Sequence, residues 1–211
     1  MKNTIYTLLF LLILIGCNQS KEKRIVIESS FNDPIDLTFD TIFDLNTYKT
    51  LGEFREARNK TIKKHEFAFL TSLFIDDHEY VINLESIRDR CSSIYPLKNK
   101  NTLYIYKDSI VKPFAYQYAK EVYAIHKLKE VYEKDVLNYN KIKNYSTSPR
   151  DLVLSFEFED SITMQSFKQV LHQVVKSYLE TNAKVKDTLP LNISLDNIRR
   201  LTPIPSLIDS I

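Results

Sequence analysis

Glycine and tryptophan are the residues that this chain most lacks. Its 211 residues include 2 glycines and no tryptophan. Loops that cradle a phosphate, and folds that bind a dinucleotide, need glycine where the backbone approaches a ligand or adopts a positive φ angle. Because neither Gly16 nor Gly52 stands in such a motif, the sequence argues against the nucleotide-binding classes, and we expect no cofactor.

Disulfides and an excess of one charge are missing too. The 2 cysteines are Cys17, in an N-terminal apolar segment, and Cys91, which falls on the apolar side of a predicted helix as a small buried hydrophobe. The formal net charge is +2, which gives no electrostatic reason to expect a nucleic-acid partner. Stability must therefore come from packing.

The N-terminal segment is the most specific motif of the chain. Lys2 precedes an apolar run from Leu8 to Ile15, which ends in Leu14-Ile15-Gly16-Cys17. This run is shorter than the roughly 20 residues of a membrane span. It resembles the lipobox of bacterial lipoproteins, in which the cysteine thiol receives a diacylglyceryl group, the preceding peptide is removed and the new amino group is acylated. The resemblance implies a signal peptide at 1–16, cleavage between Gly16 and Cys17, and lipidation of Cys17.

The residues after Cys17 indicate where such a lipoprotein would lie. Residues 17–23 form a polar tether with no apolar side chain beyond the modified cysteine. Asn18 stands where an aspartate would favour the inner membrane, and a single glutamate between two lysines does not match the acidic cluster of surface-exposed lipoproteins. We expect anchoring by the acyl chains of Cys17 to the outer membrane, on its periplasmic face. The abundance of lysine, asparagine and isoleucine resembles that of Bacteroidota proteins.

Residues 24–211 are predicted to form one α+β domain in which helices pack on a mainly antiparallel sheet, because strand and helix patterns come in mixed order with hairpins. Strands are predicted at 24–29, 35–39, 67–75, 80–82, 103–106, 151–160 and 191–195. Helices are predicted at 50–64, 84–95, 113–139 and 161–181, with one helical turn near Asn197 and an exposed loop or linker at 140–150.

Several of these elements carry sharper expectations. Thr50 and Glu53 have the spacing of a capping box, and Asn83 is the expected N-cap of the helix that follows it. Ser161 or Thr163 is the expected N-cap of the helix that ends near Thr181. The pattern of 67–75 predicts a central strand that is buried on both faces. The alternation in 151–160 predicts a strand with one exposed face, and prolines flank a predicted edge strand at 191–195.

The predicted element order of 67–158 is strand, turn, strand, helix, strand, helix, strand, with Asp108 shortly after the middle strand. This order resembles the periplasmic domain of the TolR and ExbD proteins. The glycine that those proteins favour in the first hairpin is replaced here by Asp77-His78, and their transmembrane helix is absent. The resemblance concerns topology, and an analogy of fold does not establish a function.

Two groups of residues are candidates for function. The first is His65 with Asp76-Asp77-His78-Glu79, which are side chains of the kinds that bind metals. Adjacent turn residues point in different directions, and no metal-binding spacing such as HExxH is present, so we predict no metal site. The second group is a cluster of tyrosines, which suit either a partner surface or the rim of a core: Tyr104, Tyr106, Tyr116, Tyr118, Tyr123, Tyr132, Tyr139 and Tyr145.

Other polar residues fit structural roles better than catalytic ones. His126 and His172 each lie one position from an apolar helix face, where a hydrogen-bonded structural histidine is the common case. Glu157, Glu159 and Asp160 are expected on a solvated strand face. No serine stands in a G-x-S-x-G elbow.

The sequence thus predicts a lipid-anchored, non-catalytic envelope protein that acts as a protein-interaction or structural module in the periplasm. Its expected partners are membrane lipid, through Cys17, and an unidentified envelope protein or peptidoglycan. Two alternatives stay open. One is an immunity lipoprotein that neutralises a toxin delivered by a neighbouring cell, and the other is a metal-dependent hydrolase that uses His65 and residues 76–79.

The lipidation prediction has a direct test. Radiolabelled palmitate should enter the wild-type chain and should not enter a Cys17→Ser variant, because only the thiol receives the diacylglyceryl group. Equal labelling of both proteins, or of neither, would remove the basis for the predicted location.

Overall fold

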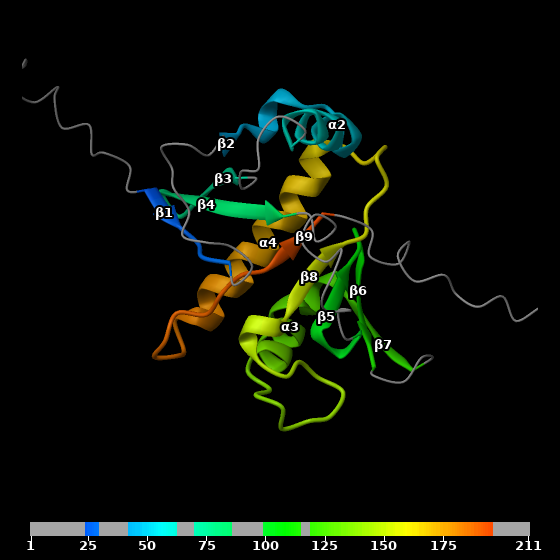
Figure 1. Cartoon of the computed structure of the whole chain (residues 1–211), viewed down its shortest axis with the longest axis vertical. Coiled ribbons are helices and arrows are strands. Elements are labelled where there is room, and N and C mark those ends of the chain that lie inside the picture. Colours follow the sequence, from blue (N-terminus) through cyan, green and yellow to red (C-terminus); the bar gives the residue numbers. More distant parts are fainter. Residues whose placement is uncertain (1–23, 30–41, 63–69, 86–98, 115–118, 196–211) are drawn as a thin grey trace, which may run out of the picture.

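Nine strands form one mixed sheet in the computed structural model, which describes residues 24–29, 42–62, 70–85, 99–114 and 119–195 (Figure 1). The strands are β1 Arg24–Val26, β2 Ile42–Phe43, β3 Leu70–Ile75, β4 His78–Glu85, β5 Thr102–Ile105, β6 Ser109–Pro113, β7 Lys120–Ala124, β8 Val153–Phe156 and β9 Ile193–Ser194. The helices are α2 Leu51–Ile62, α3 Leu128–Val136 and α4 Met164–Asn182, with 3-10 turns η1 Leu45–Thr47, η3 Asn99–Asn101, η4 Ile125–Lys127 and η5 Pro149–Asp151.

The order of strands in the sheet is β2-β3-β4-β9-β8-β5-β6-β7, and β1 pairs with β4 beside this path. The longest ladders, β3 with β4 and β6 with β7, are antiparallel. The centre, from β4 through β9 and β8 to β5, is parallel. The predicted α+β class in a single domain is therefore confirmed, and the sequence did not reveal the parallel centre because its strands lie far apart in the chain.

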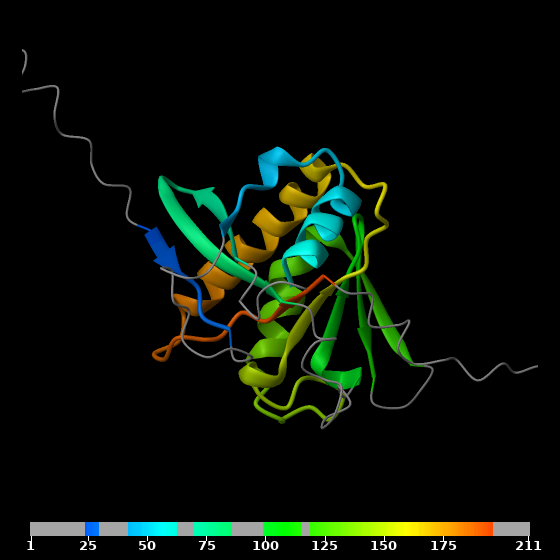
Figure 2. The same cartoon turned by 45° about the horizontal axis from the view of Figure 1, so that its top comes forward.

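Helices α3 and α4 contact one another, and the main core forms between them and the sheet (Figure 2). The predicted N-terminus of α4 is confirmed, since the Thr163 hydroxyl accepts a hydrogen bond from the Ser166 N–H at 3.2 Å. Phe167 of α4 packs against the rings of Phe156 and Phe158 at centroid separations of 5.6 and 6.1 Å. Burying an aromatic side chain of this size stabilises the fold by about 1.5–3 kcal/mol.

The opposite face of the sheet carries a smaller apolar cluster made by Tyr104, Val111 and Val153. The second face of β8 is covered as well, since Val153 and Ser155, which point to it, are fully buried. The prediction of an exposed face for 151–160 is therefore wrong. The prediction of an edge strand at 191–195 is also wrong, because β9 pairs with β4 along one edge and with β8 along the other.

The β3–β4 hairpin forms where the sequence predicted it, around a tighter turn. Ile75 pairs with His78, so the turn is Asp76–Asp77, with φ angles of 47° and 62°. Two successive positive φ angles are typical of a type I′ turn, which suits the twist of a hairpin. Phe74 is 58% exposed, so the strand is not buried on both faces as predicted, and residues 67–69 lie outside the described residues.

Asn83 is a second correction in this hairpin. It lies inside β4 and is 1% exposed, so it is not the N-cap of a helix. Its alternating neighbours Ile82 and Leu84 belong to the core, a pattern that a short helix shares. The rest of the helix predicted at 84–95, with Cys91, lies outside the described residues, as do the strand predicted at 35–39, the turn near Asn197 and the N-terminal segment 1–23.

The capping residues of α2 are confirmed in part. The Thr50 hydroxyl accepts the Glu53 N–H at 3.3 Å, while the Glu53 carboxylate accepts the N–H of Lys49, at 2.7 Å, rather than that of Thr50. Gly52 lies close to Asp160, in the segment that follows β8, and its N–H donates a hydrogen bond to the Asp160 carbonyl at 3.0 Å. A Cβ added to Gly52 would lie 2.9 Å from the Cβ of Asp160, which is too close. This close approach explains one of the chain's few glycines.

The helix predicted at 113–139 is wrong over its first half. Pro113 ends β6, residues 120–124 form β7, and α3 begins only at Leu128. Along β7 the half-buried Glu121 and Tyr123 alternate with the exposed Val122, and this period of two is compatible with helical spacing over so short a run. The two extra strands also break the element order on which the resemblance to TolR and ExbD rested.

The segment 140–150 is a loop, as predicted, although it is only partly exposed. Tyr145, Ser146 and Pro149 are buried, and the Asn138 amide donates to the Ser146 carbonyl at 2.8 Å. The loop therefore packs against the domain and does not link two domains.

The positive φ angles of the hairpin predict a stabilising substitution. Asp77→Gly should raise the free energy of unfolding by about 0.5 kcal/mol, because glycine adopts the left-handed region without steric cost. Asp187→Gly, at an exposed position without a positive φ, should lower it by a similar amount through the entropy of the unfolded chain. Urea unfolding of both variants checks this, and a loss of stability in Asp77→Gly equal to that in Asp187→Gly would contradict the turn assignment.

Candidate functional site

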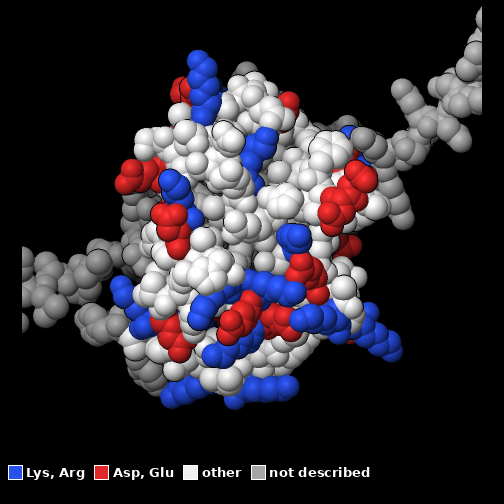
Figure 3. Space-filling view, turned by 180° about the vertical axis from the view of Figure 1, so that it is seen from behind, with Lys and Arg blue, Asp and Glu red and all other residues white. Residues whose placement is uncertain are grey.

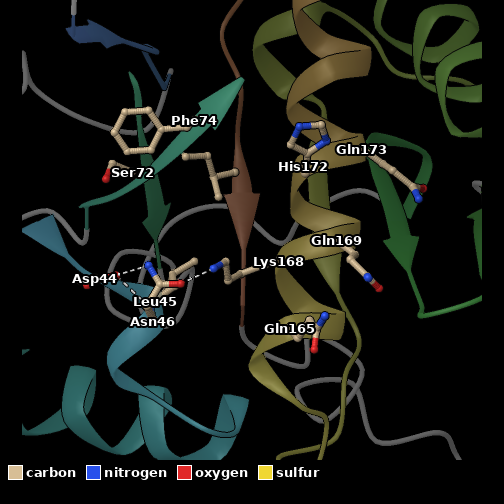
Figure 4. A pocket seen from close by; sticks show the side chains of 11 residues that line it. Asp44, Leu45, Asn46, Ser72, Phe74, Gln165, Lys168, Gln169, His172 and Gln173 are labelled. Atoms are coloured by element: carbon tan, nitrogen blue, oxygen red, sulfur yellow. Dashed lines mark hydrogen bonds between the residues drawn. The ribbon is translucent and has the colours of Figure 1, made fainter. Parts of the chain in front are cut away.

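A groove of about 900 Å³ lies between β3, η1 and α4 (Figure 4). The residues that line it are Asp44, Leu45, Asn46, Ser72, Leu73, Phe74, Gln165, Lys168, Gln169, His172 and Gln173. Its polar side chains carry four amides, one hydroxyl, one imidazole, one ammonium and one carboxylate, which belongs to Asp44.

The helical wall of the groove follows from the amphipathic sequence of α4. Phe167, Leu171 and Val174 face the core. Residues 165, 169 and 173 are glutamines spaced by four, so they share the opposite side of the helix. Lys168 and His172, also four apart, are half-buried between these two faces. The groove is therefore lined by the boundary of the amphipathic helix, where side chains are partly immobilised by the core.

The second wall is the short turn η1. The Asp44 carboxylate accepts both the main-chain N–H and the side-chain amide of Asn46, each at 2.8 Å. The amide oxygen of Asn46 in turn accepts a hydrogen bond from the Lys168 ammonium, as the dashed lines in Figure 4 show. This chain of hydrogen bonds holds the Lys168 charge at the mouth of the groove.

The floor is apolar and its upper edge is aromatic. Leu45 and Leu73 are 2% and 6% exposed, whereas the ring of Phe74 is 58% exposed. Exposed aromatic rings beside amide groups are typical of binding surfaces, because they supply contact area at a low cost in conformational entropy. The one carboxylate among the described lining residues, Asp44, lies on the η1 wall, and His172 lies on the α4 wall (Figure 4).

The cluster predicted at 76–79 is not brought together. Asp76 and Asp77 form the turn, and the Nδ1 of His78 lies 2.8 Å from the Asp76 carbonyl oxygen. The Glu79 carboxylate accepts a hydrogen bond from the Nε–H of Arg24 at 2.7 Å. Within the described ranges, no three His, Cys, Asp or Glu side chains gather in a way that would hold a metal ion. His65 lies outside those ranges.

The remaining predicted candidates have separate locations. His126 is exposed on η4. Glu157 is buried and accepts the Ser155 hydroxyl at 2.9 Å, while Asp160 pairs with Arg55 at 2.6 Å. His172 lies on a helix, as predicted, and its place in the groove is one that no local sequence pattern indicates.

The tyrosines that the structure describes do not form one surface. Tyr104, Tyr132 and Tyr145 are buried, and Tyr139 is 53% exposed at a loop. Tyr116 and Tyr118 are not among the residues described. The described members therefore fit the core-rim interpretation better than the partner-surface one.

A buried ion pair between Lys112 and Asp135 is the main polar feature that the sequence did not reveal. Both side chains are 0% exposed. The Lys112 ammonium also donates to the Lys100 carbonyl, and the Asp135 carboxylate accepts the Ser146 N–H at 2.6 Å. Burial lowers the pKa of Lys112 and raises the pKa of Asp135, and each shift is opposed by the charge of the partner.

Glu121 continues this polar region toward the surface. It lies directly across the β6–β7 ladder from Lys112, and its carboxylate accepts the hydroxyls of Tyr123 and, at 2.9 Å, Tyr145. Burial acts to raise the pKa of Glu121, but these two hydrogen bonds and nearby lysines lower it. Lys112 and Asp135 are inaccessible, so we assign the region a structural role: it joins β6, α3 and the loop that contains Ser146.

The surface carries both signs of charge. Figure 3 shows acidic and basic side chains side by side on the described part of the face opposite to the view of Figure 1. The exposed pairs Lys129–Glu180 and Lys184–Glu133 are examples of such neighbours. This mixture agrees with the near-neutral charge and gives no electrostatic reason to expect a polyanion as a ligand.

Comparison with known proteins finds no family model, no curated protein and no solved structure that matches the chain. None of the helices within the described ranges has the length and hydropathy to cross a membrane. The groove must therefore be interpreted from its own geometry.

The buried ion pair generates a stability prediction. Lys112→Met or Asp135→Asn alone should lower the free energy of unfolding by about 3–5 kcal/mol, because each leaves one buried charge without its partner. The double variant should lose clearly less than the sum of the two single losses.

Lys184→Met serves as the matched control, because Lys184 pairs with Glu133 at the surface and should contribute less than about 1 kcal/mol. Urea unfolding measures all four variants. Additive losses in the double variant would contradict a direct coupling between Lys112 and Asp135.

Proposed function

We propose that this chain is a lipid-anchored, non-catalytic protein of the bacterial envelope, and that it holds another envelope component in the groove between β3 and α4. The observation that carries the proposal is the groove itself, which combines an apolar floor, amide groups and the exposed ring of Phe74.

The anchor is supported by the sequence before the domain. The lipobox-like segment ends at Cys17, and β1 begins at Arg24, after a polar tether. Two or more acyl chains give a stable attachment, whereas a single chain binds a bilayer only reversibly. A tether of this length keeps the domain close to the membrane and leaves the groove accessible to proteins of the same compartment.

Binding rather than catalysis is supported by the composition of the groove. Its side chains supply hydrogen bonds, one ammonium and apolar area, and the Ser72 hydroxyl and the His172 imidazole stand on different walls, β3 and α4 (Figure 4). The hydrolase alternative requires residues 76–79 to act together. In the structure, however, Glu79 binds Arg24, and the His78 ring contacts the Asp76 carbonyl. The immunity alternative is a special case of the proposal in which the bound component is a toxin.

Site-specific photocrosslinking tests the proposal. A photoreactive phenylalanine analogue is placed at Phe74, and in a control chain at Val122, which is 59% exposed on β7 at the far end of the sheet. In cells that produce the full chain, position 74 should give one reproducible crosslinked species and position 122 should not.

The identity of that species distinguishes the alternatives. An envelope protein supports the proposal in its general form, and a toxin supports the immunity protein. The same crosslinks at both positions, or none at position 74, would contradict binding in the groove.

A further inference from the structure

We infer that the groove binds an extended peptide segment of its partner, which adds as a new strand to the open edge of β3. The inference rests on the proposed function and specifies its ligand. It depends on the main-chain groups of β3 and on the side chains that flank them.

The hairpin register shows which main-chain groups of β3 point outward. In a type I′ turn the residues before and after it, Ile75 and His78, form a hydrogen-bonded pair. Pairs alternate along an antiparallel ladder, so Leu73 also bonds to β4, while Ser72 and Phe74 direct their N–H and C=O groups away from it. The bond from the Ile27 N–H to the Val81 carbonyl, on the other side of β4, agrees with this alternation.

On the outward side, β2 covers only the start of β3. The parallel ladder consists of Ile42 with Leu70 and Phe43 with Thr71, after which the chain turns into η1. Within the described residues, no strand lies beside the Ser72 carbonyl or beside the N–H and C=O of Phe74. As far as the structure describes the chain, these three groups therefore form an open edge at the side of the groove.

An extended polypeptide is the ligand that matches such an edge, because its main chain offers donors and acceptors at the same spacing. One residue of an antiparallel peptide would exchange both hydrogen bonds with Phe74. The Ser72 carbonyl would accept a further hydrogen bond, from the main-chain N–H of the peptide residue two positions away. The acetamido groups of a peptidoglycan glycan project from its sugar rings and are not part of an extended main chain, so a glycan would use mainly the ring and the amide side chains.

The flanking side chains define which peptide fits. The side chain of the residue opposite Phe74 lies on the same face as the exposed ring, so an apolar residue is favoured there. Its two neighbours point to the face of Leu73, on which α4 packs, toward Lys168 and His172. Acidic residues are favoured at these positions, and the ligand is predicted to alternate acidic and apolar residues.

The opposite edge of the sheet provides a matched control. The Phe114 N–H donates to the Ala119 carbonyl, so by the same alternation the main chain of Val122 points outward from β7. Val122 is as exposed as Phe74, but it lies outside the residues that line the groove. Lys120 and Glu121 precede it in β7, and charged residues on an edge strand discourage pairing.

Fluorescence anisotropy with the purified full chain tests the inference. The probes are a ten-residue peptide of alternating glutamate and leucine, the same peptide with lysine in place of glutamate, and the first peptide with N-methylated central leucines. The glutamate peptide should bind; N-methylation, which removes main-chain donors and keeps the side chains, should weaken binding by about tenfold or more, and the lysine peptide should bind more weakly.

Substitutions in the protein separate the main chain from the ring. Phe74→Ala removes the ring, and Phe74→Pro also removes the outward N–H without breaking the bonds of β3 to β4. Phe74→Pro should therefore bind more weakly than Phe74→Ala, and Val122→Pro should bind as the wild type does. Equal unfolding midpoints of the Phe74 and Val122 variants show that the comparison is made between folded proteins.

The outcomes distinguish this inference from the proposed function. Equal binding of the methylated and unmethylated peptides, or tight binding of peptidoglycan fragments in place of peptides, would overturn strand addition. If crosslinking at position 74 persists in that case, the groove remains a binding site with another ligand. Dimerisation of the chain that Phe74→Pro abolishes would instead make a second copy the occupant, and would also overturn the inference.

Discussion

The pairing of β9 with two other strands holds the halves of the sheet together. Ile193 and Ser194 pair with residues 84–85 of β4 on one side and with residues 154–155 of β8 on the other. Asn192 fixes the entry to this strand, because its amide donates to the carbonyls of Arg150 and Leu152, both at 3.0 Å, and its oxygen accepts the Ser29 hydroxyl at 3.0 Å. Ile193 and its neighbours are fully buried, so this short strand is stabilised by its surroundings rather than by its length.

The groove depends on the same arrangement. α4 leads directly into the segment that ends in β9, and it crosses the half of the sheet that contains β3. The ring contacts of Phe167 hold the helix on β8, while the hydrogen bond from Lys168 to Asn46 joins it to η1. The walls of the groove therefore belong to elements that are fixed by a common core, which is the condition for a preformed binding site.

Local patterns predicted local structure well. The hydroxyl cap of α4, the capping residues of α2 and the Asp76–Asp77 hairpin all follow from residue types at short spacing. The shortage of glycine has a visible consequence in the same place, since the left-handed positions 76, 77, 139 and 140 are occupied by Asp, Asp, Tyr and Asn. Asp and Asn tolerate this region better than other residues with a Cβ.

Long-range pairing was the part that the sequence could not reveal. The parallel centre joins strands that are separated by whole helices, and β7 shares its short apolar pattern with a helix. In the sequence, nothing distinguishes Lys112 and Asp135 from charged residues at the surface, but in the fold both are buried and form an ion pair. No sequence motif marks the groove either, because its walls come from three separate elements, β3, η1 and α4. Lys168, His172 and Phe74 line the same groove only because these elements pack together.

Amide hydrogen exchange at Phe74 tests the central claim, that a partner segment pairs with the open edge of β3, most directly. Exchange of the Phe74 N–H is measured by NMR in the free chain and with the alternating glutamate–leucine peptide bound, with the Val122 N–H as the internal reference. The account predicts that binding slows exchange at Phe74 and leaves Val122 unchanged. Peptide binding that leaves the exchange of both amides unchanged would contradict strand addition at β3.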